Sequence, residues 1–310
     1  MKLDYVPLLR VMREIHSIPR GQPPDFNGMK RFRQFVRTIF PRKKNGKIDE
    51  NAVYLIPLLA INPMAKDHVT ALLDAYLAMD ADGIGARVAA EVAVRLADVP
   101  GDFKVGLVVA DDLMGAGTNR YNDEFTFRFG PDQFRSGGRP PKRLRWLKDY
   151  WLTGVLWGSE SPSERAVREA ILTAAHRVAY MHQHGPARTL REMLAQEGQV
   201  MARAGCSGPT LDAEDIAYTR EVLDPYRDED DLRTCIECLF GDEAGRTLGF
   251  TPRGLSPWAG VRIASRTARS EGASLLQSTP VSHQSFTQRE RFGELLRVRS
   301  GPKRKMNSYS

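Results

Sequence analysis

The chain has 310 residues, of which 42% are hydrophobic and 27% are charged. This length is enough for one large domain or two ordinary ones with a sizeable core. No apolar run approaches the roughly 18 residues of a membrane helix, and charged residues occur too early in the first 15 positions for a secretory signal peptide. Three cysteines are too few for a disulfide framework. We therefore expect a cytoplasmic protein without a membrane span.

The net charge of +7 is concentrated at the end of the chain. Residues 258–310 hold ten Lys or Arg and three Glu, so the charges of residues 1–257 sum to zero. Within that body, 28–48 and 133–148 contain eight and six basic residues and no acid, whereas 212–231 contains nine acids and two arginines. Such blocks can face a polyanion or one another. The zero sum favours pairing within the fold.

Helical spacing dominates the first hundred residues. The apolar residues of 5–12, 32–39 and 69–77 recur at intervals of three and four, which is typical of amphipathic helices. Asp82 can cap a further helix that runs to Leu96. The spacing predicts an all-helical first third of the body.

The middle of the chain changes character. Residues 103–110 are apolar, rich in β-branched side chains and bounded by Gly101 and Asp111, which predicts a buried strand. Residues 124–129 alternate phenylalanine with polar residues, which predicts a half-buried strand. Residues 146–157 are aromatic and fit either a third strand or a helix. This region is therefore expected to contain both helices and strands.

Four helices with start signals are expected from position 161. Ser161–Glu164 and Thr189–Glu192 fit the capping-box pattern, in which Ser or Thr precedes Glu by three residues. Asp212 and Asp215 can cap a third helix. The acids of 228–231 place negative charge at the start of a fourth, where the helix dipole favours it. Short connections between them suggest a layer of packed helices.

These patterns predict a mainly α-helical α+β body over 1–257, with a small central sheet surrounded by helices. The body can be divided into a helical part, a mixed part and a second helical part, over 1–100, 101–160 and 161–257. Residues 258–310 are expected to form a flexible, disordered basic tail rich in Ser and Arg, because they bury too little apolar surface to offset the entropy of ordering. A functional tail and out-of-frame coding are alternatives.

The main candidate site is the polar loop after the strand at 103–110. Ligand sites of α/β folds lie at the carboxyl ends of strands. Paired carboxylates can bind a divalent cation or supply a general base, arginine can hold a carboxylate or phosphate, and glycines let the backbone approach a ligand. The predicted catalytic residues are Asp111, Asp112, Arg120, Asp123 and Glu124; the predicted cofactor contacts are Gly115, Gly117 and Asn119; and the predicted metal ligands are Asp111 and Asp112. The alternative is a polar surface turn that satisfies its own backbone.

A second possible metal site is built from cysteines. Cys235 and Cys238 have the spacing of half a zinc site. Cys206 and either His182 or His184 would complete it. The alternative is a set of buried, inert thiols on an apolar helix face.

Two functions remain open on the sequence alone. The first is an enzyme, or a protein that binds a small ligand or a metal, with its site in the 111–124 loop; its cofactor is unknown and is possibly a divalent metal ion. The second is a non-catalytic helical interaction protein that binds a protein or nucleic-acid partner through its segregated charge blocks and its basic tail. The chain contains no Walker A loop, no G-x-S-x-G and no H-E-x-x-H, which disfavours several common enzyme classes.

Overall fold

The computed structural model describes residues 1–17, 45–46, 67–113, 119–129, 151–206 and 211–277. The chain divides into two units, Met1–Glu271 and Gly272–Ser310. The helices and strands belong to the first unit, apart from the last residues of helix α12. No helix among the described residues has both the length and the apolar character needed to cross a membrane.

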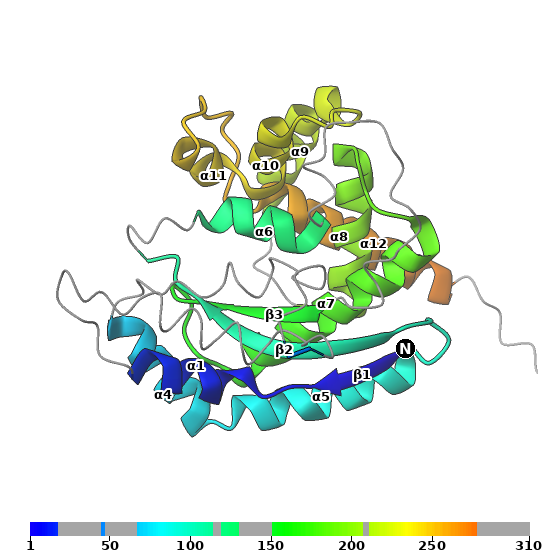
Figure 1. The fold of residues 1–310 in the computed structure, drawn as a ribbon. Helices are drawn as coiled ribbons and strands as arrows, with labels where there is room; N and C mark the ends of the chain where they lie inside the picture. The colour runs from blue at the N-terminus through cyan, green and yellow to red at the C-terminus, as the bar shows by residue number, and fades with distance from the viewer. Residues whose placement is uncertain (18–44, 47–66, 114–118, 130–150, 207–210, 278–310) are drawn as a thin grey trace, which may run out of the picture. The chain divides into compact units, whose positions relative to one another are not determined.

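A three-stranded parallel sheet forms the centre of the fold (Figure 1). Its strands are β1 (Lys2–Tyr5), β2 (Asp102–Ala110) and β3 (Trp151–Trp157), in the order β1-β2-β3. Lys2 pairs with Asp102, and Lys104 pairs with Trp151. Residues 105–110 are all buried, as expected for the central strand of a parallel sheet covered on both faces.

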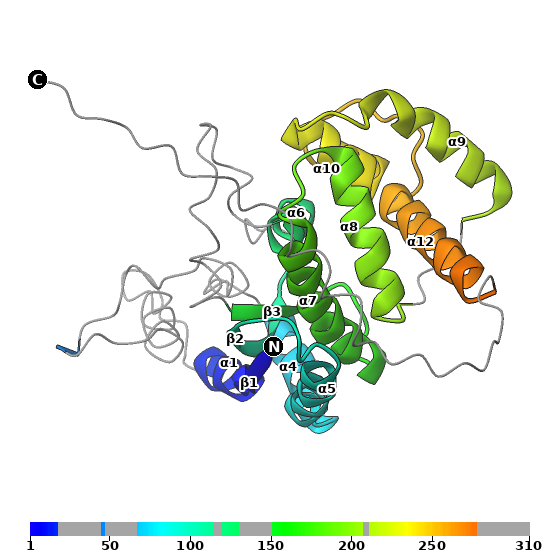
Figure 2. The ribbon, with the colours of Figure 1, turned by 90° about the vertical axis from the view of Figure 1, so that its right-hand side faces the viewer.

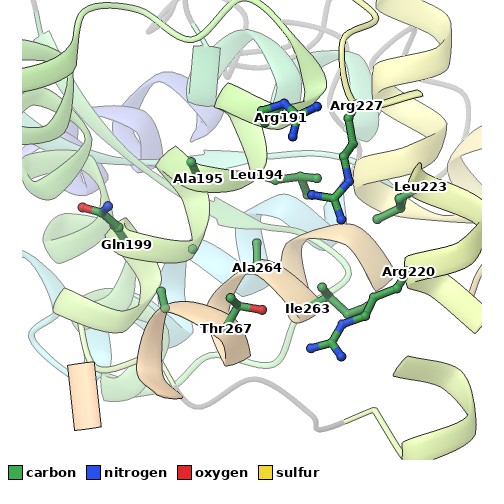
Figure 3. A pocket seen from close by; sticks show the side chains of 12 residues that line it. Arg191, Leu194, Ala195, Gln199, Arg220, Leu223, Arg227, Ile263, Ala264 and Thr267 are labelled. Carbon is green, nitrogen blue, oxygen red and sulfur yellow. The ribbon is translucent and has the colours of Figure 1, made fainter. Parts of the chain in front are cut away.

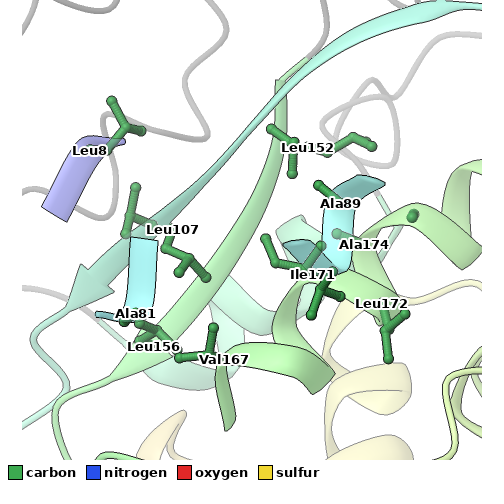
Figure 4. Packing of buried hydrophobic residues seen from close by; sticks show 14 of the residues in the cluster. Leu8, Ala81, Ala89, Leu107, Leu152, Leu156, Val167, Ile171, Leu172 and Ala174 are labelled. Carbon is green, nitrogen blue, oxygen red and sulfur yellow. The ribbon is translucent and has the colours of Figure 1, made fainter. Parts of the chain in front are cut away.

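Four helices pack with the sheet around the first core of the body. They are α1 (Leu8–Ser17), α4 (Asp67–Ala78), α5 (Ala81–Arg95) and α7 (Glu164–His184). Helices α5 and α7 pack against each other and against the sheet, and Figure 2 shows both on the same side of the strands. Apolar side chains of the sheet and these helices form one core, part of which is drawn in Figure 4.

The remaining helices surround a second core. These elements are α6 (Arg120–Phe129), α8 (Leu190–Arg203), α9 (Ala213–Leu223), the 3-10 turn η4 (Asp224–Tyr226), α10 (Leu232–Phe240), α11 (Asp242–Thr247) and α12 (Ala259–Gln277). The second core is built mainly from α6, α8, α10 and the start of α12. The prediction of a mainly helical α+β protein with a small central sheet is thus confirmed, and β2 lies where it was expected.

Two predictions of secondary structure are wrong. The first residues form strand β1 rather than part of a helix, because they pair with β2 at the edge of the sheet. The segment 124–129 belongs to helix α6 rather than to a strand. Phe125 and Phe129 stand four residues apart and share the second core, whereas Phe127 packs against the first. A helix between two cores therefore produced the alternation of phenylalanines.

The helix starts agree with the sequence in part. Thr189 and Glu192 form the predicted capping box, and Asp212 caps α9 through the backbone N–H of Asp215. The predicted box at 161–164 is displaced, because Ser163 is the residue that caps α7. The prediction that Asp82 caps a helix is wrong: Asp82 lies inside α5 and accepts a hydrogen bond of 2.8 Å from the Tyr5 hydroxyl.

The expected flexible tail does not begin at 258. Residues 259–277 form helix α12, whose side chains at Ala259, Val261 and Ile263 are buried. A Cβ atom at Gly260 would lie 2.2 Å from the backbone oxygen of Cys238, so α12 and α10 are in direct backbone contact. Small side chains allow this approach, and they are also why the apolar pattern of this segment is weak. The rest of the predicted tail, 278–310, lies outside the described residues, as do the expected helix at 32–39 and the basic blocks at 28–48 and 133–148.

Candidate functional site

The carboxyl ends of β2 and β3 meet at one edge of the sheet. Asp111 and Asp112 follow β2 directly, and Gly158 and Ser159 follow β3. The Gly158 N–H donates a hydrogen bond of 2.8 Å to the backbone oxygen of Ala110. The pairing of β2 and β3 therefore continues one residue beyond the end of β3. This edge is the usual position of ligand sites in parallel sheets.

Asp111 holds a histidine at this edge. Its carboxylate is buried, with 2% of the side chain exposed, and Oδ1 lies 2.8 Å from Nε2 of His68 in the first turn of α4. The Leu113 N–H also donates to Oδ1, over 3.2 Å. Asp111 Oδ2 is buried and has no hydrogen-bond partner among the described residues. The His68 side chain is one-third exposed, so it can be reached from solvent, whereas Asp111 cannot.

Asp112 turns toward a different set of partners. Its two oxygens accept from the Ser159 N–H at 2.8 Å and the Ser159 hydroxyl at 2.6 Å. A terminal nitrogen of Arg120 lies 3.3 Å from Asp112 Oδ2 and 2.9 Å from Ser159 Oγ. Asp112 thus ties the end of β2 to the turn after β3 and to the start of α6.

Arg120 contacts both polar groups and aromatic rings. Its other terminal nitrogen donates to Glu160, and its guanidinium carbon lies 5.0 Å from the ring centre of Trp157 and 5.4 Å from that of Trp258. Its Nε is buried without a partner in the described part of the chain. Arg120 makes three hydrogen bonds to the protein, to Asp112, Ser159 and Glu160, so its present geometry is that of a residue that positions the edge.

A network of buried ion pairs links α6 to α7 and α8. Arg128 donates to Glu124 over 2.8 Å and to Glu197, which also accepts two hydrogen bonds from Arg177, of 2.8 and 3.0 Å. Burial raises the pKa of the Glu197 carboxyl, but Arg177 and Arg128 outweigh this effect and lower the pKa to about 2. Glu124, predicted as catalytic, therefore serves here as the partner of a buried arginine.

Asn119 directly precedes α6, and Asp123 lies in its first turn. Asn119 Oδ1 accepts from the N–H groups of Tyr121 and Asn122, at 3.0 and 3.2 Å, and so caps the helix. The Asp123 carboxyl makes no hydrogen bond among the described residues. Burial and the neighbouring Glu124 raise its pKa to about 6.

A cavity of about 540 Å³ adjoins this edge at Arg120, Trp157 and Glu160. Trp157 and Trp258 form part of its wall, and its charged lining residues are Arg120, Arg128, Arg165, Arg177, Arg262, Glu124, Glu160 and Glu169. Thr153 Oγ1 and Arg120 Nε belong to lining residues and are buried without a hydrogen-bond partner among the described residues. Buried polar atoms are normally paired, so these two atoms are exceptions among the lining residues.

The three cysteines of the possible zinc site are not brought together. Gly115 and Gly117 lie outside the described residues. Cys206 belongs to the first core, whereas Cys235 and Cys238 belong to the second. Burial raises the pKa of Cys206 to about 11 and the pKa values of the other two thiols to about 12. Within the described ranges, no group of three or more His, Cys, Asp or Glu is arranged to hold a metal ion.

Several residues of the edge were missed by the sequence analysis. His68 stands alone in the sequence, and no spacing rule connects it to Asp111, 43 positions away. Ser159 and Glu160 follow the strand at 151–157, so the rule that sites lie at the carboxyl ends of strands indicates them once β3 is recognised. Glu197 carries no local signal, because its role depends on arginines of two other helices.

Comparison of the chain with protein-family models, curated proteins and solved structures gave no match.

Proposed function

We propose that this protein is an enzyme that performs acid–base chemistry on a small polar substrate at the carboxyl edge of its sheet. The observation that carries the proposal is the contact between buried Asp111 and His68 at the end of the central strand. Histidine is the side chain that most often transfers protons in enzymes, and a buried carboxylate on its far nitrogen orients the ring.

The roles of the two residues follow from the hydrogen bond. Asp111 Oδ1 accepts from His68 when the ring carries its proton on Nε2, which leaves the lone pair on Nδ1. His68 Nδ1 is then the general base, and it returns the proton as the general acid. Asp111 is a positioning residue, which fixes the ring and stabilises the imidazolium that forms when Nδ1 is protonated.

The adjoining cavity is proposed to bind the rest of the substrate. Its aromatic walls and its charged lining residues suit an organic molecule that carries both apolar and polar groups. Asp112, Ser159 and Arg120 keep the two strand ends at a fixed separation. The proposal thus changes the predicted role of Arg120 from an anion clamp to a positioning residue. The three free, buried cysteines suit a reducing compartment such as the cytoplasm.

The test is a turnover screen that requires no known substrate. The protein is incubated with a metabolite extract, and mass spectrometry follows compounds that are consumed or formed. We expect turnover by the wild type and a loss of about 10²–10⁴-fold in His68→Gln, because general acid–base catalysis contributes rate factors of this order. Asp111→Asn should lose activity while keeping its circular dichroism spectrum.

His182→Gln is the matched control, since His182 is an exposed histidine at the end of α7. Its turnover should equal that of the wild type. Turnover by His68→Gln within twofold of the wild type would refute the proposal. Absence of any turnover by the wild type would also refute it, and would favour a non-catalytic protein that binds a protein or nucleic-acid partner.

A further inference from the structure

A second pocket lies away from the sheet, between α8, α9 and α12. Its volume is about 360 Å³, which is within the range of about 300–1,000 Å³ found for small-molecule sites. Figure 3 shows Leu194 and Ala195 of α8 and Ile263 and Ala264 of α12 around it.

The pocket exists because the two helices cross through small residues. A Cβ atom at Gly198 would lie 2.5 Å from the backbone oxygen of Ala264, so α8 and α12 touch through their backbones at this point. Ala195 and Ala268 also line the pocket and leave space beside the crossing that larger side chains would fill. The result is an apolar floor.

The charged side chains of the pocket are all arginines. Arg191, Arg220 and Arg227 line it, and no acidic residue does. In Figure 3, Arg220 and Arg227 extend from the α9 side toward Ile263 and Leu194. The polar end of the pocket therefore offers several N–H donors from positively charged guanidinium groups.

Two of these arginines are partly occupied by acids outside the pocket. Arg191 donates to Asp228 through Nε and one terminal nitrogen, at 3.1 and 3.0 Å, and Arg227 donates to Asp224 through Nε at 2.8 Å. Arg220 has no ion pair within the described part of the chain. The guanidinium of Arg220 and the terminal nitrogens of Arg227 are therefore the donors that remain for a ligand.

We propose that this pocket binds an aliphatic carboxylate, with its carboxylate on Arg220 and Arg227 and its alkyl chain on the floor between α8 and α12. Arginine binds carboxylates through paired N–H donors, and the apolar floor gains free energy from each buried methylene. This site is independent of the His68 edge, so the failure of either proposal leaves the other intact.

Isothermal titration calorimetry with octanoate and its uncharged analogue octanamide tests this site. Octanoate should bind the wild type at least about tenfold more tightly, since hydrogen bonds to charged groups carry this difference. Lengthening the carboxylate by one methylene should increase the affinity about fourfold. Arg220→Gln should reduce octanoate affinity about tenfold and leave octanamide affinity unchanged.

Two further variants separate the charge from the floor. Arg266→Gln removes an exposed arginine of α12 that does not line the pocket, and should bind octanoate like the wild type. Ala195→Phe fills the floor from an exposed position and should weaken both ligands. Equal affinity for octanoate and octanamide, or unchanged octanoate affinity in Arg220→Gln, would overturn the proposal. Binding of an acidic peptide without any binding of octanoate would overturn it in favour of a protein partner.

Discussion

Replacing Glu197 with glutamine should remove the charge that holds two buried arginines together. Glu197 is fully buried, and its carboxylate accepts from Arg128 and from Arg177. Glutamine has the same shape but no charge, so both guanidinium groups would lose their shared counter-ion. Arg128 would keep Glu124, at 2.8 Å, whereas Arg177 would keep no acidic partner among the described residues.

The expected loss is large because the pair is buried. The Glu197 pKa lies at about 2 instead of its ordinary 4.5, which corresponds to about 3 kcal/mol in favour of the ionised form. Breaking one partner of a buried ion pair costs about 3–5 kcal/mol. Because the folded-state pKa is the lower one, this stabilisation is complete above pH 4.5 and is lost as the pH falls toward 2.

Urea unfolding followed by circular dichroism measures the effect. A loss of about 3 kcal/mol should lower the urea midpoint by about 1–2 M, and the difference from the wild type should shrink below pH 4.5. Glu91→Gln is the matched control, because Glu91 and Arg168 form an ion pair at 3.3 Å with 47% and 38% of their side chains exposed. Such pairs contribute about 0–1 kcal/mol. A midpoint for Glu197→Gln equal to that of the control would refute the reasoning.

Three further predictions follow from the packing and the titrating groups. Asp123→Asn should stabilise the protein by about 1 kcal/mol above pH 6 and should have no effect below pH 3.8. Burial raises the pKa of the Asp123 carboxyl to about 6, so the ionised form destabilises the fold, and solvent screening reduces this cost. Equal thermal midpoints of the variant and the wild type at neutral pH would contradict this. Gly260→Ala should cost about 1–3 kcal/mol, since its Cβ would meet the Cys238 oxygen at 2.2 Å; an unchanged melting temperature would show that α12 does not pack on α10. The three cysteines should resist dithionitrobenzoate in the folded protein and all react in concentrated guanidinium chloride, because they are buried thiols with raised pKa values; rapid reaction of the folded protein would contradict their burial.

The sequence predicted those parts of the fold that depend on local patterns. The strand at 103–110 was found because its apolar run is bounded by Gly101 and Asp111, and the capping box at 189–192 because it is a local hydrogen-bond pattern. Strand β1 was missed because four residues at a sheet edge carry no periodicity of their own. Helix α12 carries no strong apolar pattern, because its small residues pack directly against another backbone.

The sequence indicates only those site residues that directly follow the buried strand in the chain. Asp111 and Asp112 were selected because they follow the buried strand, and the structure places both at the sheet edge. Their partners His68 and Ser159 come from segments 43 and 47 residues away. No pattern within one segment indicates such pairs, because they form only after the strands align and α4 packs beside them.

The central claim is that Asp111 fixes His68 with its proton on Nε2 and its lone pair on Nδ1. A long-range proton–nitrogen correlation spectrum of the histidine-labelled protein at about pH 8, where histidine is normally neutral, measures this directly. His68 is assigned by the signal that disappears in His68→Gln. The account predicts a single Nε2–H tautomer for His68 in the wild type and a mixture of tautomers in Asp111→Asn. A His68 ring protonated on Nδ1, or the same tautomer mixture in both proteins, would contradict it.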